Sequence, residues 1–154
     1  MWRYTAGEIM TPGALAVGAD APFAAVARVL AERHVHAVAV LDEERRVIGV
    51  VSEGDLMCKA AAKEPAEEVS PFLETRRRRA ARAKAAGVVA GDLMSAPAVT
   101  VGVAAPVVDA AEELAQGRYR QLPVVDDAGR MLGMITRADL VQAFALPDEV
   151  VRAD

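Results

Sequence analysis

The stretch GVVSEGDL at residues 49–56 returns as GMITRADL at residues 133–140, 84 positions further along the chain. At this spacing residues 8–57 align with residues 92–141 without a gap, and 15 of the 50 paired positions are identical. A match of this length at one fixed offset indicates a tandem duplication. We therefore expect two copies of one structural unit.

Both copies predict the same order of elements. An apolar strand (residues 14–17 and 98–101) leads to a proline suited to the first turn of a helix, which spans residues 22–33 and 106–116. Two strands follow, HAVAVL and VIGVVS in the first copy and QLPVVD and MLGMIT in the second. Their nearly continuous apolar runs are typical of a sheet covered on both faces. A second helix begins at Ser52 or Thr136, so the order is strand, helix, strand, strand, helix.

The predicted fold class is α/β (α+β), with two tandem β-α-β-β-α repeats packed into one pseudo-two-fold globular module. A unit of about 50 residues buries too little apolar surface to be stable alone, so the copies should pack together. The predicted organisation is a first repeat at residues 8–57, a basic helical connector at 58–91, a second repeat at 92–145 and a polar tail at 146–154. Ser70 and Pro71 predict a connector helix that ends near Gly87.

The turn between the last two strands differs between the copies. Gly129 offers a positive φ there, whereas the first copy has Arg45. We therefore expect the first turn to be shaped differently or to be mildly strained.

Composition favours a globular protein outside the membrane. Apolar residues make up 53% of the chain and charged residues 26%, and no window approaches the roughly 18 consecutive apolar residues of a membrane span. The first residues lack the basic and apolar parts of a secretory signal, which predicts a cytoplasmic location. The single Cys58 cannot form an internal disulfide, and we interpret it as a small core residue.

Each copy places an aspartate three positions after a hydroxyl residue, as Ser52 with Asp55 and Thr136 with Asp139. This spacing is that of a capping box, in which both side chains bind free N–H groups at a helix start. The box prefers Glu or Gln, yet both copies carry Asp. A carboxylate at a helix start can also accept hydrogen bonds from both hydroxyls of a ribose, and helix N-termini favour anions. The pattern leaves open capping alone and capping combined with ligand binding.

The doubled pattern, RQLPVVDDAGRMLGMITRADL with HAVAVLDEERRVIGVVSEGDL, resembles a tandem pair of CBS domains, the module named after cystathionine β-synthase. The resemblance implies a regulatory module that binds AMP, ADP, ATP or a related adenosyl compound in clefts between the repeats. It further implies a homodimer formed through helices, an unknown regulated protein as partner and no required cofactor. The sequence offers no Cys/His or Ser/His/Asp arrangement and no Walker-type loop, so we expect no enzymatic activity.

The resemblance also implies which residues bind the ligand. Ribose contacts fall on four residues of the two motifs: Ser52, Asp55, Thr136 and Asp139. Phosphate contacts fall on a basic residue three positions before a strand proline, which is Arg120 before Pro123. The base pocket falls on four positions near the strands: Leu15, Ala37, Val99 and Gln121.

The first copy departs from the family pattern. Its phosphate position is His36, and Ala39 replaces the usual proline. Glu53 stands inside the first motif where Arg137 stands in the second, and like charges near a phosphate repel by order 1 kcal/mol in water. We therefore predict that Arg137 is a phosphate contact together with Arg120, and that the second motif favours phosphorylated ligands more than the first.

Two other features allow different functions. His34 and His36 could place two imidazoles on one face of a strand, but no third ligand is apparent and we expect no metal. The connector holds eight Lys or Arg against four Glu in a chain of net charge −4, with an arginine run at residues 76–79. This run is interpreted as a solvated connector, a contact to a polyphosphate or partner, or a nucleic-acid contact, the last opposed by the acidic total charge. The rival function is a structural or interaction protein with empty clefts whose connector binds nucleic acid or an acidic partner.

Overall fold

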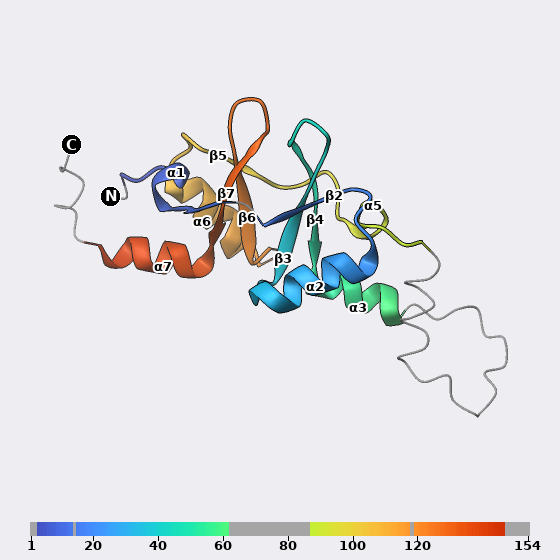
Figure 1. Cartoon of the computed structure of the whole chain (residues 1–154). Coiled ribbons are helices and arrows are strands. Elements are labelled where there is room, and N and C mark those ends of the chain that lie inside the picture. The colour runs from blue at the N-terminus through green and yellow to red at the C-terminus, as the bar shows by residue number, and fades with distance from the viewer. Residues whose placement is uncertain (1–2, 14, 62–86, 118, 147–154) are drawn as a thin grey trace. The chain divides into compact units, whose positions relative to one another are not determined.

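The computed structural model describes residues 3–13, 15–61, 87–117 and 119–146 (Figure 1). The predicted connector helix, the arginine run at residues 76–79 and residues 147–154 of the predicted tail lie outside the described residues. The described part is mixed α/β, with two sheets and six helices. None of these helices is long and apolar enough to cross a membrane.

The chain divides into two compact units, and each combines parts of both repeats. The first-motif unit consists of Leu15–Leu41 and Ile48–Ala96. The second-motif unit consists of Met1–Ala14, Asp42–Val47 and Pro97–Asp154. Each unit therefore contains one motif together with a short segment that belongs, by sequence, to the start of the other repeat.

The first-motif unit is built on a three-stranded sheet in the order β2-β3-β4. β2 (Ala16–Gly18) pairs in parallel with β3 (Ala37–Leu41), and α2 (Phe23–Arg33) connects them. β4 (Val47–Ser52) leads directly into α3 (Glu53–Ala61), and α5 (Ala90–Leu93) lies in the later segment. The core joins side chains from the sheet, α2 and α5: Phe23, Val26, Leu30, Val38, Val40, Val51, Ala90 and Leu93.

The second-motif unit is built on a four-stranded sheet in the order β1-β7-β6-β5. β1 (Thr11–Pro12) pairs antiparallel with β7 (Met131–Thr136), which pairs antiparallel with β6 (Gln121–Val125). β5 (Val101–Gly102) pairs in parallel with β6. The helices are α1 (Ala6–Ile9), α6 (Val107–Ala115) and α7 (Arg137–Ala145). The core again joins sheet and helices: Ala6, Val101, Val107, Ala110, Leu114, Leu122, Val124, Ile135 and Leu140.

The two long predicted helices are confirmed, with a shift of one residue at their starts. Pro22 and Pro106 are the N-cap residues with extended backbone, and the helical turns begin at Phe23 and Val107. Proline lacks the N–H that a helix start would leave unpaired, so it suits this boundary.

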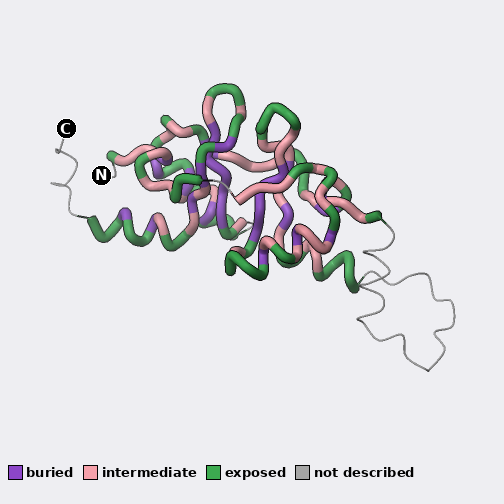
Figure 2. Tube along the Cα trace, viewed as in Figure 1, coloured by how far each residue is buried: buried purple, intermediate pink, exposed green. Residues whose placement is uncertain are grey.

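Burial of the strands follows the prediction only in part (Figure 2). β3 and β6 are buried along almost their whole length, as expected for strands covered on both faces. In β7 the burial alternates, and Leu132 is 38% exposed between the buried Met131 and Gly133. Successive side chains of a strand point to opposite faces, so one face of β7 is open at this position. Two-sided cover was therefore the wrong expectation for this strand.

The two predicted turns have the same shape, which corrects the expectation of different shapes. Arg45 has φ 67° and Gly129 has φ 82°. Asp42 fixes the first turn, because its Oδ1 accepts hydrogen bonds from the backbone N–H groups of Glu44 and Arg46, both at 2.9 Å. The N–H of Arg46, aided by its guanidinium, holds the pKa of the Asp42 carboxyl below its usual value. The expected strain is present, since a left-handed backbone at a residue with a Cβ costs roughly 1–2 kcal/mol.

Cys58 is exposed on α3, so its interpretation as a core residue was wrong. Its place next to Met57 in an expected helix gave that expectation, but α3 buries none of its residues fully.

Candidate functional site

Each motif aspartate helps to cap the helix in whose first turn it lies. Asp55 Oδ2 accepts hydrogen bonds from the N–H of Ser52 at 2.8 Å and from its hydroxyl at 3.0 Å, while Ser52 Oγ accepts from the N–H of Asp55 at 3.2 Å. Thr136 and Asp139 make the same three bonds at 2.8, 3.0 and 3.2 Å. The capping interpretation is therefore confirmed in both motifs.

Capping uses only one oxygen of each carboxylate. Within the described ranges, Asp55 Oδ1 has no hydrogen-bond partner. Asp139 Oδ1 accepts one long bond, 3.3 Å, from the hydroxyl of Thr11. Both aspartates are partly exposed. An ionised carboxylate can accept about four hydrogen bonds, so each of these groups keeps acceptor capacity that its cap does not use.

The glycine that opens each motif is required by close packing of a distant segment. A Cβ on Gly133 would lie 2.6 Å from the carbonyl oxygen of Thr11, because β1 pairs against β7 at this position. A Cβ on Gly49 would lie 2.8 Å from Cγ of Met94. Both distances are shorter than carbon and oxygen atoms tolerate without displacement. The glycine is therefore repeated because, in each unit, a neighbouring chain segment leaves no room for a Cβ.

The neighbouring segments occupy equivalent places in the two units. Thr11 lies beside the second motif, and Ser95, its counterpart 84 residues later, lies beside the first. Ser95 exchanges two backbone hydrogen bonds with Val50, at 2.9 and 3.2 Å. Each motif thus has a second hydroxyl residue close by, supplied by the start of the other repeat.

Our sequence reasoning missed Thr11 and Ser95 as site residues. Two signals could have found them. The position holds a hydroxyl residue in both copies, and the similarity extends upstream to TAGE at residues 5–8 and VAGD at residues 89–92. The first of these is a full capping box, since Glu8 accepts from the N–H of Thr5 at 2.8 Å and Thr5 accepts from that of Glu8 at 3.3 Å.

The candidate phosphate residues have different partners. His36 Nδ1 lies 3.3 Å from Oε2 of Glu53, and the N–H of Glu53 donates to the carbonyl oxygen of His36 at 2.9 Å. Arg137 donates from Nη2 to the carbonyl oxygen of Leu114 at 3.3 Å. Arg120 is exposed and has neither a hydrogen bond nor an ion pair within the described part of the chain.

The four candidate base-pocket residues fall into two pairs, one in each unit. Leu15 packs against the core of the first-motif unit, where Ala37 is buried at the start of β3. Val99 packs against the core of the second-motif unit, where Gln121 is buried at the start of β6. Gln121 is paired with Thr136 in the sheet register, which places a buried polar side chain next to the second motif.

The two histidines considered as metal ligands have different structural roles. His34 ends α2 in a left-handed conformation with φ 53°, and His36 contacts Glu53. Among the described residues, no three or more His, Cys, Asp or Glu side chains form a group that could hold a metal ion.

The sequence pattern of the CBS domain matches the chain twice, at residues 6–61 and 90–146. This chain is a member of the CBS-domain family. The CBS pair is 31% identical over 150 residues to the chloroplastic CBS domain-containing protein CBSX1 of Arabidopsis thaliana, a match that covers 91% of this chain and 64% of the relative. It therefore spans just under two thirds of the length of that curated relative.

Two solved structures show the same fold. The crystal structure of the CBS-pair protein CBSX2 from Arabidopsis thaliana is 28% identical, with a TM-score of 0.74, and the match covers 98% of this CBS pair and 99% of that chain. CBSX2 in complex with AMP matches with a TM-score of 0.72 and 28% identity, over 97% of this chain and 99% of that chain.

Proposed function

We propose that this CBS pair is a regulatory module that binds an adenine nucleotide, AMP, ADP or ATP, or a related adenosyl compound, and thereby controls a partner protein. The observation that carries the proposal is the carboxylate oxygen that capping leaves available on Asp55, with its counterpart on Asp139. The relative CBSX2, at 28% identity, has been crystallised with AMP.

In this proposal the two hydroxyls of a ribose donate to Oδ1 of the motif aspartate. Ser52 and Thr136 add a hydroxyl at each site. Arg120, whose guanidinium has no partner among the described residues, binds phosphate by charge-assisted hydrogen bonds. Leu15, Ala37, Val99 and Gln121 surround the base. A ligand bound in this way shifts the module between two states only by its different affinity for them. The cytoplasmic location remains a prediction.

Replacing Asp55 and Asp139 together by alanine tests the proposal. Each substitution removes charge-assisted hydrogen bonds worth about 2 kcal/mol, so AMP affinity should fall about thirtyfold at each site. Isothermal titration of the full chain measures this. Glu8→Ala is the matched control, because it removes a capping carboxylate of the same geometry outside the motifs and should leave AMP affinity unchanged. Thermal unfolding shows that each variant is folded. AMP binding by the double variant at wild-type affinity would refute the ribose role.

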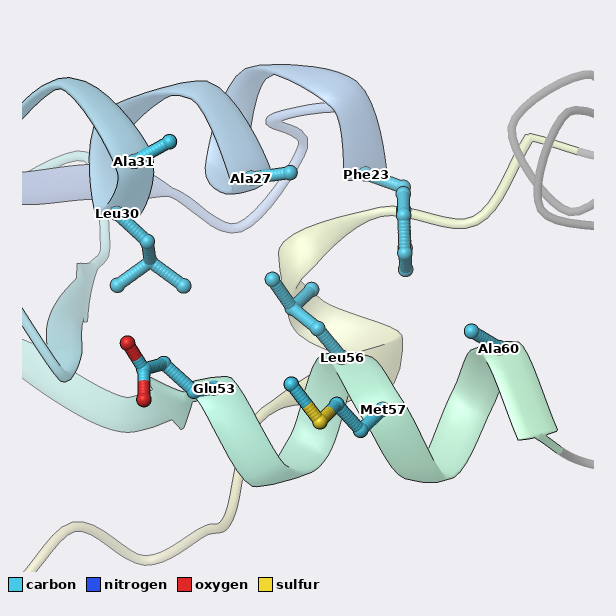
Figure 3. Close-up of a pocket in the computed structure, with 8 residues that line it drawn as sticks. All are labelled: Phe23, Ala27, Leu30, Ala31, Glu53, Leu56, Met57 and Ala60. Atoms are coloured by element: carbon cyan, nitrogen blue, oxygen red, sulfur yellow. The ribbon is translucent and has the colours of Figure 1, made fainter. Parts of the chain in front are cut away.

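We further propose that two copies of the chain pair through their helices. In the first-motif unit, α2 and α3 border a groove of ≈ 310 Å³ that is lined by seven apolar side chains and, at one end, by Glu53 (Figure 3), and Met57 in this lining is 68% exposed. In the second-motif unit, Val141 holds the equivalent position on α7 and is 65% exposed, and Phe144 is 39% exposed. In a two-fold dimer the same apolar patch of each subunit is covered by the other subunit. The exposed apolar residues on α3 and α7 are patches that such a dimer would cover.

Negative charge introduced on α3 and α7 should prevent the dimer from forming. Met57→Glu combined with Val141→Glu is expected to sediment as a monomer, because a dimer would bury both carboxylates without partners. Lys59→Glu is the control, since Lys59 is exposed on α3 but does not line the groove. Sedimentation velocity of the full chain measures the outcome, and a monomeric wild type would rule out the dimer.

A further inference from the structure

The two motifs carry opposite charges at equivalent positions. Glu53 begins α3 and Arg137 begins α7, immediately after the motif hydroxyl in each case. The side chain of Glu53 extends toward the end of α2 (Figure 3), where its carboxylate lies 3.3 Å from the imidazole of His36. The equivalent of His36 in the second motif is Arg120. The first motif therefore has two carboxylates and one imidazole, whereas the second has one carboxylate and two guanidinium groups.

We propose that Glu53 is a specificity residue that makes the first-motif site select adenosyl ligands without negative charge on the 5′ group, while the second-motif site takes the phosphorylated ligand. This inference rests on the proposed function, since it assumes a ribose held by Asp55 and Asp139. It assigns a different ligand class to each half of one chain.

The position of Glu53 brings its charge close to the 5′ group. Glu53 contacts His36, the candidate phosphate residue of this motif, so in the proposal the 5′ group of a ribose on Asp55 lies on the side of Glu53. Exposed charges interact over a Debye length of about 10 Å. A phosphate there meets two carboxylates. A neutral thioether or a cationic sulfonium at the same atom meets no repulsion.

The contact with His36 increases this selectivity. His36 contacts the first motif through its imidazole, whose Nδ1 is already occupied by Glu53. A phosphate that used this nitrogen would have to displace the Glu53 carboxylate. The side chains of His36 and Glu53 are 57% and 50% exposed, so water screens the effect and it remains moderate.

The second motif has the reverse arrangement. Among the described residues Arg120 has no partner, and Arg137 makes one hydrogen bond, of 3.3 Å, to the carbonyl oxygen of Leu114. A phosphate on this side meets two positive charges and one carboxylate. Guanidinium groups bind phosphate through paired N–H donors, which favours an anionic 5′ group here.

Two ligands that share the base and the ribose but differ in the 5′ group show how that group changes the affinity. AMP and 5′-methylthioadenosine are titrated by calorimetry, at one fixed pH, into the full chain carrying Asp139→Ala, which leaves the first-motif site. We expect the thioether to bind at least fivefold tighter than AMP, and Glu53→Gln to strengthen AMP binding about fivefold while changing thioether binding less than twofold. In the mirrored Asp55→Ala chain, Arg137→Gln should weaken AMP by a similar factor and spare the thioether.

The wild-type chain gives an independent measurement that needs no substitution of a capping residue. Saturated with AMP at the tighter site, it should still bind one 5′-methylthioadenosine per chain. An unchanged AMP-to-thioether ratio in Glu53→Gln would overturn the role of Glu53 and leave the proposed function standing. If Asp55→Ala and Asp139→Ala left the affinity for both ligands unchanged, the proposed function itself would be overturned.

Discussion

Gly133→Ala is expected to destabilise the second-motif unit by about 3 kcal/mol, the upper part of the range for overpacking a filled site. The new methyl group would lie 2.6 Å from the carbonyl oxygen of Thr11 and 2.7 Å from Sδ of Met10. The carbonyl belongs to backbone that pairs with β7, so it cannot move aside without breaking that pairing. The substitution should therefore loosen β1, and with it the hydroxyl of Thr11 that binds Asp139.

Urea unfolding followed by circular dichroism measures the change. Gly102→Ala is the control, because no described residue apart from its chain neighbours lies within 4 Å of a Cβ at that exposed position, and it should shift stability by less than about 0.5 kcal/mol. Gly49→Ala should fall between the two, since the atoms it meets belong to the flexible side chain of Met94. Equal stability of Gly133→Ala and Gly102→Ala would show that β1 does not pack on the motif as described.

Leu122→Ala is expected to destabilise the protein by about 3–4 kcal/mol. Leu122 is fully buried in β6, where both faces of the strand are covered, and it belongs to the core of the second-motif unit. Removing its side chain loses the transfer free energy of three carbon atoms and leaves a cavity that the strand cannot close.

Leu132→Ala is the matched control, because it makes the same chemical change on the neighbouring strand at a side chain that is 38% exposed. It should cost less than about 1 kcal/mol, since little apolar surface is lost from the interior. The two variants are compared by thermal and urea unfolding of the full chain. Similar losses in both would contradict the assignment of β6 as the doubly covered strand.

Local patterns predicted most of the regular structure. The bounds of β4 and β7 agree with the predicted runs VIGVVS and MLGMIT, and α2 and α6 start one residue after the predicted position. The short first strands were less well placed, since β2 begins two residues and β5 three residues later than expected. Strands of two or three residues carry little apolar periodicity, so their ends depend on pairing with a neighbour.

Exposure could not be predicted from the same patterns. Apolar runs in β6 and β7 look alike in sequence, yet only β6 is buried throughout. Cys58 follows Met57 in an apolar stretch, and both are exposed on α3. Burial depends on which elements cover a face, and a run of apolar residues does not specify its cover.

The sequence by itself determined the duplication, the order of the elements in each repeat and the hydroxyl and aspartate pairs that cap α3 and α7, because each of these depends on neighbouring residues or on a fixed repeat offset. Only the tertiary structure decided which segment lies against each motif. Thr11 contacts Asp139 across 128 positions of sequence, and His36 contacts Glu53 across 17. Contacts of this kind are set by how whole strands and helices pack, so no local spacing of residue types encodes them.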